Sequence, residues 1–170
     1  MEDTKSQNKV LNFFKELIPY IIIVLVVILI RSFLFTPIRV VGPSMNPTLA
    51  SGDIMILNKV AKINRFDIVV IKSSKSPEIL IKRVIALPGE TIEIKDNVIY
   101  VNEKELKEKF GSGKTSDIPL MKVPDGEYFV LGDNRPISAD SRLFGTFSKK
   151  EIKGTTKFTI FPFKNFGSKK

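Results

Sequence analysis

An apolar run near the amino terminus constrains this chain more than any other feature. Residues 17–35 are apolar or aromatic, with Arg31 and Ser32 as the polar exceptions. As a helix this run would rise about 28 Å, close to a bilayer hydrocarbon thickness of about 30 Å. Because the run has no polar face, the pattern favours a membrane anchor over a buried core helix.

The flanks of this run indicate its fate and its orientation. Residues 36–41 contain no A-x-A-like site of small residues, which favours an uncleaved anchor over a removed signal peptide. Lysines in residues 1–16 favour a cytoplasmic tail, and a long following domain translocates largely regardless of its charge. We therefore expect a tail at 1–16, a single-pass anchor at 17–35 in the cell membrane, and an extracytoplasmic catalytic domain at 36–170.

Short β-branched segments separated by turn signals follow Pro37. They predict a mostly β fold, one largely antiparallel domain built as a barrel or as folded sheets. The predicted strands are 38–41, 54–57, 67–72, 80–87, 91–95, 98–101, 128–131 and 157–161. Asp96-Asn97 predicts a tight hairpin turn within a hairpin and loop insertion at 88–123. One helix is predicted outside the anchor, at 102–110.

The residue types that are missing exclude several chemistries. The chain contains no His and no Cys. A Ser-His-Asp triad, a thiol nucleophile and a zinc–thiolate site are therefore excluded. Any proton acceptor at neutral pH must be a carboxylate or a lysine whose pKa is shifted. We expect neither a metal nor a cofactor.

The net charge of +9 at pH 7 suggests an acidic partner. The basic residues are spread along the chain rather than gathered in one run, which favours anionic lipid over nucleic acid. The carboxyl-terminal segment is rich in phenylalanine, at Phe158, Phe161, Phe163 and Phe166. We expect a strand end that faces the core there, with a lipid-contacting edge as the alternative.

Ser44 and Lys82 are candidates for a nucleophile and its base. Ser44 lies in a loop at 42–49 that two prolines and a glycine constrain, although an ordinary turn serine is the alternative. On a strand, the alternation of side chains gives Lys82 apolar neighbours on its own face, which favour a neutral amine. Arg83 lies on the other face, either solvated or paired with a carboxylate.

A polar segment at 132–142 forms the third candidate element. It holds two Asp, two Arg, two Ser and one Asn. A Ca²⁺ loop is an alternative, but Arg135 and Pro136 stand where the EF-hand pattern needs ligands. A hydroxyl from this segment would suit the orientation of the Lys82 amine.

Taken in order, these segments resemble the bacterial type I signal peptidases in their compact, Gram-positive-like form. The resemblance rests on the anchor, Pro-Ser-Met-x-Pro-Thr-Leu at 43–49, Gly52-Asp53, the stretch 82–90, and Gly-Asp-Asn-Arg…Ser-x-Asp-Ser-Arg at 132–142. It implies Ser44 as nucleophile, Lys82 as general base and Ser138 as the hydroxyl that orients Lys82. It also implies two supporting pairs, Asp140 with Arg142 and Asp133 with Arg83.

The resemblance further implies a substrate class and a reaction. The substrates would be preproteins with small side chains at the first and third positions before the cut, hydrolysed through an acyl-enzyme by a monomer. Narrow apolar pockets would be lined by Ile38, Val40, Met45, Leu80 and Ile81. The oxyanion would bind the Ser44 backbone N–H, with the Gly42 N–H or a water as second donor.

The chain departs from the family pattern at four positions. Gly42 replaces a serine that serves some members as an oxyanion donor, and Phe66 replaces a common glycine. Glu90 stands for aspartate, and Pro136 is unusual in the last motif. Two other functions remain open: a self-cleaving repressor-like Ser-Lys domain, and a membrane-tethered β domain that binds a partner with Ser44 and Lys82 incidental.

Overall fold

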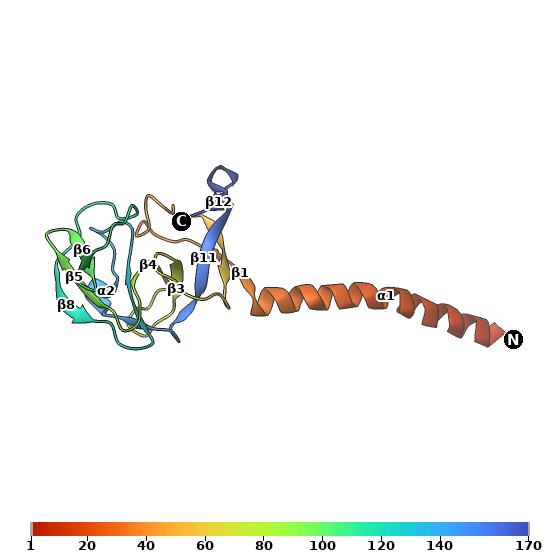
Figure 1. The fold of residues 1–170 in the computed structure, drawn as a ribbon. Coiled ribbons are helices and arrows are strands. Elements are labelled where there is room, and N and C mark those ends of the chain that lie inside the picture. Colours follow the sequence, from red (N-terminus) through yellow and green to blue (C-terminus); the bar gives the residue numbers. More distant parts are fainter. Residues whose placement is uncertain (1, 170) are drawn as a thin grey trace. The chain divides into compact units, whose positions relative to one another are not determined.

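The computed structural model describes residues 2–169, without the side chains of residues 2–12, 14 and 33. The chain divides into two compact units, one ending at Thr36 and one beginning at Pro37. A long helix makes up most of the first unit, and two β-sheets make up the second (Figure 1).

Helix α1 runs from Glu2 to Phe33, so the predicted tail belongs to the same helix from residue 2 onward. The expected helical end at residue 35 was wrong, because Phe35 already begins strand β1. Thr36 precedes Pro37, and a residue before proline disfavours the helical conformation. Large apolar side chains between residues 18 and 30 are about half exposed. No helix in the described part of the chain is long and apolar enough to cross a membrane, so the anchor stays a prediction.

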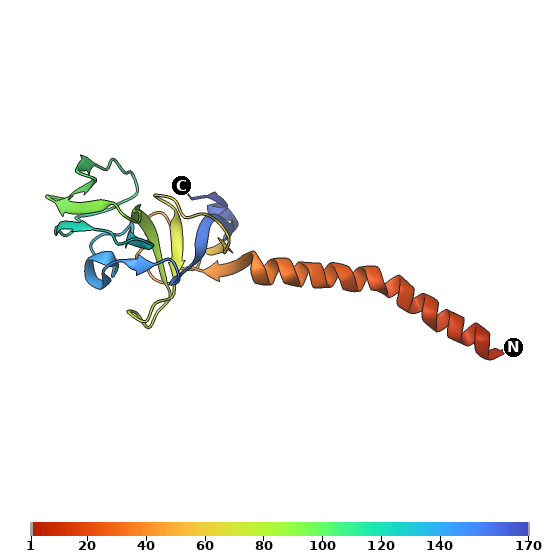
Figure 2. The same ribbon diagram turned by 60° about the horizontal axis from the view of Figure 1, so that its bottom comes forward.

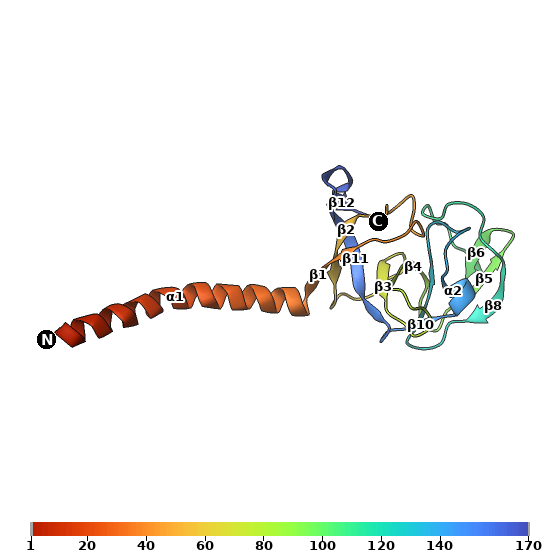
Figure 3. The same cartoon turned by 180° about the vertical axis from the view of Figure 1, so that it is seen from behind.

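The larger sheet confirms the mostly antiparallel β fold. Its strand order is β1-β2-β11-β3-β4-β9-β10, with β12 paired to β11. Figures 1 and 3 label strands β11, β3 and β4 of this sheet. The pairings described for it are antiparallel. Its strands are β1 Phe35–Arg39, β2 Ile54–Asn58, β3 Ile68–Ile71, β4 Leu80–Ala86, β9 Glu127–Leu131, β10 Phe147–Ser148, β11 Ile152–Phe161 and β12 Gly167–Ser168.

The insertion at 88–123 forms the smaller sheet, with strand order β7-β6-β5-β8. Figure 2 shows its green-to-cyan strands set apart from the yellow and blue strands of the larger sheet. Its strands are β5 Thr91–Lys95, β6 Val98–Val101, β7 Lys104–Glu105 and β8 Ile118–Lys122. Asp96 and Asn97 both have positive φ in a two-residue hairpin, which confirms the predicted turn.

The helix predicted at 102–110 was wrong. Asn102 and Glu103 both have positive φ and form a second tight turn, after which β7 pairs with β6. This turn reverses the chain, and the Leu106 N–H then donates to the Ile99 carbonyl across the hairpin. Short helices lie instead at α2 Ser141–Phe144 and η1 Phe163–Asn165.

Buried clusters fix the two sheets and the loops between strands. One cluster joins β5 to β4 and β9, with Ile92, Ile94 and Phe129 fully buried or nearly so. A second cluster joins β2, β3 and β4 to the loop after β1, through Val40, Met45 and Leu49. Strand β4 contributes to both, so its residues are held from two sides.

Candidate active site

The loop between β1 and β2, which carries Ser44, is anchored to the hydrophobic core. Met45 and Leu49 are buried in the core cluster beneath the loop. The Val40 N–H donates to the Asp53 carbonyl at 2.8 Å and ties the two ends of the loop together. Because its neighbours are anchored in this way, Ser44 is held half-buried at the edge of the core.

Lys82 lies beside this serine on β4, a strand on which all seven residues are buried. The Lys82 Nζ lies 2.7 Å from Ser44 Oγ. Burial lowers the pKa of the Lys82 amine from 10.5 to about 8; the Asp140 carboxylate opposes this shift and the Arg142 guanidinium adds to it. At neutral pH the neutral amine is thus far more populated than on an exposed lysine.

Ser138 and the Ser44 loop approach each other at Gly132. A Cβ on Gly132 would overlap the Ser138 hydroxyl and would lie 2.6 Å from the Ser44 carbonyl oxygen. Only glycine therefore lets the two serine segments meet there. In the described part of the chain the buried Ser138 Oγ has no hydrogen-bond partner, so the implied bond to Lys82 is absent.

Arg83 and Asp133 form a pair that is fully shielded from solvent. Arg83 donates from Nε and Nη2 to the two Asp133 oxygens, at 2.9 and 2.7 Å, and from Nη1 to the Phe66 carbonyl at 2.8 Å. The sequence left two alternatives for the Arg83 side chain, solvation or a carboxylate partner, and the structure shows the carboxylate partner. The pair joins β4 to the segment 132–142.

Asp140 and Arg142 hold the second half of that segment. The buried Asp140 carboxylate accepts from the Gly132 N–H at 3.0 Å and from Arg142 Nε at 2.9 Å. Arg142 Nη2 also donates to the Arg135 and Ser138 carbonyls. These bonds join the end of the segment 132–142 to its beginning, so the segment folds back on itself with Ser138 in the turn.

A mainly apolar cavity of about 560 Å³ lies next to β4, and four charged residues also line it: Arg39, Lys72, Glu78 and Lys153. Of the five predicted pocket residues, Ile38 and Ile81 line this cavity. Val40, Met45 and Leu80 do not line it and are buried in the core clusters instead. The other apolar lining residues are Val41, Leu57, Val70 and Ile79.

Comparison with known proteins decides the family. The family model described as "Signal peptidase, peptidase S26" matches residues 13–161. The chain belongs to the signal peptidase family. The resemblance inferred from the motifs is thereby confirmed, and the protein is an enzyme, a serine peptidase. Membership supports the removal of signal peptides from preproteins, rather than the repressor-like or the partner-binding function.

Individual relatives of the signal peptidase family are similar over nearly the whole chain. Signal peptidase I of Bacillus licheniformis is 40% identical and the alignment covers 96% of each chain. Signal peptidase I T of Bacillus subtilis (strain 168) is 41% identical over 94% of this chain and 89% of the relative. A crystal structure of a signal peptidase I from Enterococcus faecalis V583 is 36% identical, with a TM-score of 0.51, and covers 56% of this chain and 97% of that chain.

Phe66 is the departure from the signal peptidase pattern with the clearest physical effect. It has φ +68°, the left-handed region that favours glycine, which fits the glycine common in the family. A bulky residue there is strained, by about 1–2 kcal/mol. The Phe66 ring packs on Phe110 at 5.4 Å between centroids, and the Phe110 ring lies 3.7 Å from the Arg83 guanidinium. The aromatic pair covers the buried ion pair.

The other departures are accommodated locally. Glu90 reaches back to accept from the Leu87 N–H at 2.7 Å and from Arg65. Pro136 packs where Gly113 has no side chain. The Gly42 N–H donates to Ser51 Oγ at 3.3 Å, so this amide is not free for an oxyanion.

Sequence reasoning missed Asn134, which bonds to the Ser44 loop, and two residues that line the cavity beside β4. The Asn134 N–H donates to the Ser44 carbonyl at 3.0 Å, and its side-chain amide donates to the Pro43 carbonyl at 3.3 Å. Composition alone left that polar tract ambiguous. Val41 and Ile79, both strongly exposed at the cavity, stand beside the predicted residues Val40 and Leu80 in the sequence. Val41 follows β1 by two residues and Ile79 directly precedes β4, so apolar residues at the ends of the two strands were the available signal.

Proposed function

We propose that this enzyme removes amino-terminal signal peptides with a Ser44–Lys82 dyad, by way of an acyl-enzyme. The observation that carries the proposal is the 2.7 Å approach of a buried lysine amine, with a pKa near 8, to a serine hydroxyl. A lysine of this kind replaces the histidine that the chain lacks. Both groups come from one chain, so a monomer suffices.

The steps follow from this pair. The neutral Lys82 amine accepts the hydroxyl proton as Ser44 Oγ bonds to the substrate carbonyl carbon. Collapse of the tetrahedral intermediate breaks the C–N bond, and the Lys82 ammonium gives its proton to the leaving amine. A water then loses a proton to Lys82 as it attacks the ester carbonyl. The second tetrahedral intermediate collapses by breaking the C–Oγ bond, and the Lys82 ammonium returns its proton to Ser44 Oγ, which restores the neutral amine and the hydroxyl. We further propose that Ser138 orients the amine: within the described residues its buried hydroxyl makes no hydrogen bond, which leaves it available to bond to Lys82 during the reaction.

The Ser44 backbone N–H is the proposed oxyanion donor. In the described part of the chain it donates to no protein acceptor, which leaves it available to a substrate oxygen. Since the Gly42 N–H is bonded to Ser51 Oγ, a water is the better second donor.

The cavity beside β4 supports a preference for apolar side chains before the cut, and the restriction to small ones is proposed from the family resemblance. Ile38, Ile81, Val41 and Ile79 give it an apolar wall with no hydrogen-bonding side-chain atom of their own. A substrate strand beside them would place alternate side chains in the cavity. Val40, Met45 and Leu80 would then act from beneath, by holding the wall in place.

One pH-resolved cleavage experiment tests the proposal. We expect the purified full-length protein in detergent to cut a signal-peptide-bearing preprotein after a small residue. The rate constant kcat/KM should rise with pH through about 8, because only the neutral Lys82 amine accepts a proton. Ser44→Ala should abolish cleavage at every pH, whereas Ser74→Ala, at an exposed serine, should keep it. A flat profile or active Ser44→Ala protein would overturn the dyad.

The arrangement in the membrane belongs to the same proposal. A tail at 1–16 in the cytoplasm, an anchor at 17–35 and a catalytic domain at 36–170 outside the cell would bring the dyad to exported substrates. The half-exposed apolar side chains of α1 between residues 18 and 30 support burial in lipid. Resistance of the protein to alkaline extraction from membranes checks the anchor, and protease access in intact cells checks its orientation.

The carboxyl-terminal phenylalanines support a second contact with anionic lipid. The expectation of a core-facing strand end was wrong, because Phe161, Phe163 and Phe166 are 50%, 79% and 59% exposed. Lys164 lies exposed among them. Aromatic rings beside basic side chains suit the interface of an anionic bilayer, where the rings enter the head-group region and the amines meet phosphate.

A tryptophan probe tests this contact, since the chain has no Trp of its own. We expect Phe163→Trp protein, reconstituted in anionic vesicles, to emit at shorter wavelength and to be quenched by brominated acyl chains. The matched control is Leu120→Trp, an exposed apolar position on β8, which should stay unquenched. Equal, water-like emission from both proteins would contradict the lipid contact.

A further inference from the structure

We infer that residues 108–115, which lie in the insertion outside the dyad and its motifs, form a clamp that positions Ser44 for the proposed reaction. The clamp is the set of contacts that Glu108, Phe110, Ser112 and Thr115 make with the segment 132–142 and with Arg83. This inference rests on the proposed function and adds positioning residues to it.

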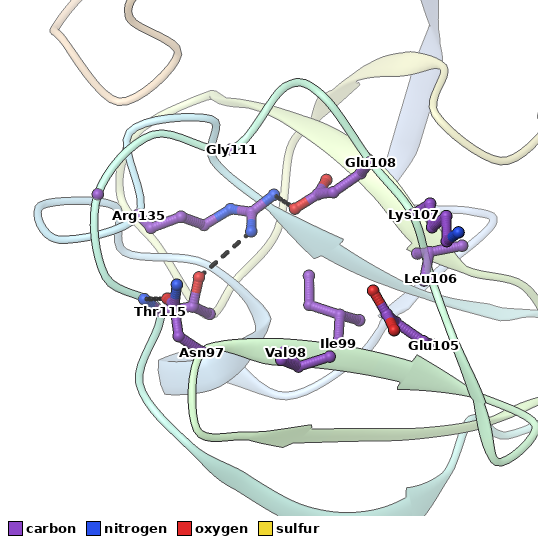
Figure 4. Close-up of a pocket in the computed structure, with 11 residues that line it drawn as sticks. Asn97, Val98, Ile99, Glu105, Leu106, Lys107, Glu108, Gly111, Thr115 and Arg135 are labelled. Carbon is purple, nitrogen blue, oxygen red and sulfur yellow. Dashed lines mark hydrogen bonds and ion pairs between the residues drawn. The ribbon is translucent and has the colours of Figure 1, made fainter.

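The first contact of the clamp is a buried ion pair. Arg135 is 3% exposed, and Glu108 is the carboxylate paired with it in the described part of the chain. Arg135 Nη1 also donates to Thr115 Oγ1 at 3.3 Å. Figure 4 shows the guanidinium between these two side chains, beside a cavity of about 310 Å³. Removing the carboxylate would leave a buried charge without its partner.

The second contact is between backbones. The Ser112 N–H donates to the Asp133 carbonyl at 2.7 Å, and the Arg135 N–H donates to the Ser112 carbonyl at 3.0 Å. These two bonds bracket Asn134 in a parallel bridge. Gly111 lies against the Arg135 guanidinium so closely that a Cβ would come within 2.6 Å of two of its nitrogens. The clamp therefore leaves Asn134 little freedom.

Asn134 connects the clamp to the nucleophile, because its hydrogen bonds restrain the backbone at Pro43 and Ser44. Its N–H holds the Ser44 carbonyl at 3.0 Å, and its side-chain amide holds the Pro43 carbonyl at 3.3 Å. The Pro43 carbonyl and the Ser44 N–H belong to one planar peptide unit, so fixing the carbonyl also sets the direction of the N–H. That N–H is the proposed oxyanion donor. A movement of Asn134 would thus misplace both the hydroxyl and the oxyanion donor.

Phe110 provides a third contact on the same side. Its ring lies 3.7 Å from the Arg83 guanidinium, which pairs with Asp133 at the start of the same segment. The clamp therefore meets the segment 132–142 at Asp133, Asn134 and Arg135 in succession. These three residues directly precede the turn that leads to Ser138.

Kinetics on full-length protein test the clamp. We expect Glu108→Gln to lower kcat by about tenfold or more with little change in KM, because misplaced reacting groups slow the chemistry without removing substrate contacts. Glu105→Gln, which lines the same cavity from β7, is the matched control and should keep the wild-type kcat. In a double-mutant cycle, Glu108→Gln and Asn134→Ala should reduce kcat by much less together than the product of their separate effects. Fully multiplicative effects, or an unchanged kcat in Glu108→Gln, would overturn the inference.

Amide hydrogen exchange gives a readout that does not need cleavage. In Glu108→Gln we expect faster exchange in peptides covering 42–49 and 132–138, with β3 and β4 unchanged. Faster exchange confined to residues 104–115 would overturn the clamp even if the proposed function holds. If the wild type fails to cleave any preprotein, amide exchange still tests whether residues 108–115 restrain the Ser44 loop. Glu108→Asp, which keeps the charge but shortens the reach, serves where the glutamine variant folds poorly, and should show the same two regions.

Discussion

Replacing Lys82 by methionine is expected to abolish cleavage and, at the same time, to stabilise the fold. Loss of the general base should lower kcat by about 10³-fold or more. The lysine pKa falls from 10.5 to about 8 on folding, so the native state binds its proton less tightly than the unfolded state does. At pH 7 this opposes folding by about 3 kcal/mol. Methionine has a similar volume and carries no charge, so it removes this opposition to folding. We expect the free energy of unfolding at pH 7 to rise by about 2–3 kcal/mol, after subtraction of the lost hydrogen bond to Ser44.

The sign of this effect sets its pH dependence. Below pH 8 the lysine is protonated in both the native and the unfolded protein, and the shifted pKa opposes folding by its full amount of about 3 kcal/mol. Between pH 8 and pH 10.5 the native lysine is neutral while the unfolded one is still charged. The wild type should therefore gain stability over that window. By pH 10 the opposition from the shifted pKa falls to about 1 kcal/mol, the lost bond to Ser44 offsets it, and the advantage of Lys82→Met should shrink to about zero. Urea unfolding at pH 7 and pH 10 measures it. Lys114→Met, at an exposed lysine, should show no such gain. A Lys82→Met protein that is destabilised at pH 7 would contradict the assignment of Lys82 as a buried base with a lowered pKa.

Much of the fold was predictable from local pattern, and the failures have local causes. The hairpin at Asp96-Asn97 was predictable because turn residues stand between two alternating runs. Strand β8 was missed because Pro119 interrupts its pattern, and proline within a strand run argues against a strand. The helix predicted at 102–110 failed because its charged residues signal helix, whereas the positive φ of Asn102 and Glu103 reverses the chain. The local pairing of β7 with β6 across this turn overrode the helix propensity of the charged residues.

The candidate site was predictable in part only. Alternation along β4 placed Lys82 among apolar neighbours, and the structure buries it. The same alternation gives no account of Arg83, whose burial depends on Asp133, 50 residues away in the chain. Ser44 was chosen among the serines by family resemblance, because a loop sequence does not reveal which amine lies opposite. The clamp depends on contacts between distant segments, which no local pattern encodes.

Breaking the Arg83–Asp133 pair is expected to have the largest effect on stability. Both side chains are fully buried, and Asp133 is the carboxylate paired with Arg83 in the described residues. Asp133→Asn keeps the shape but leaves the guanidinium charge uncompensated in the interior. We expect a loss of about 3–5 kcal/mol in the free energy of unfolding. The loss should exceed that of any exposed pair, because solvent screens those charges.

Two comparisons separate this cause from a general intolerance of substitution. Lys157→Met breaks the pair with Asp67, whose lysine is 38% exposed while its carboxylate is 7% exposed. Because Asn64 still donates to the Asp67 carboxylate from its backbone and its side chain, the unfolding free energy should fall by only about 1 kcal/mol. The double substitution Arg83→Met with Asp133→Leu removes both buried charges and should recover most of the loss, because no unpaired charge remains. Urea unfolding of the three proteins at one pH measures all of these values. A double variant that is as unstable as Asp133→Asn would show that the hydrogen bond from Arg83 to the Phe66 carbonyl and the contact with Phe110, rather than charge compensation, hold this part of the site together.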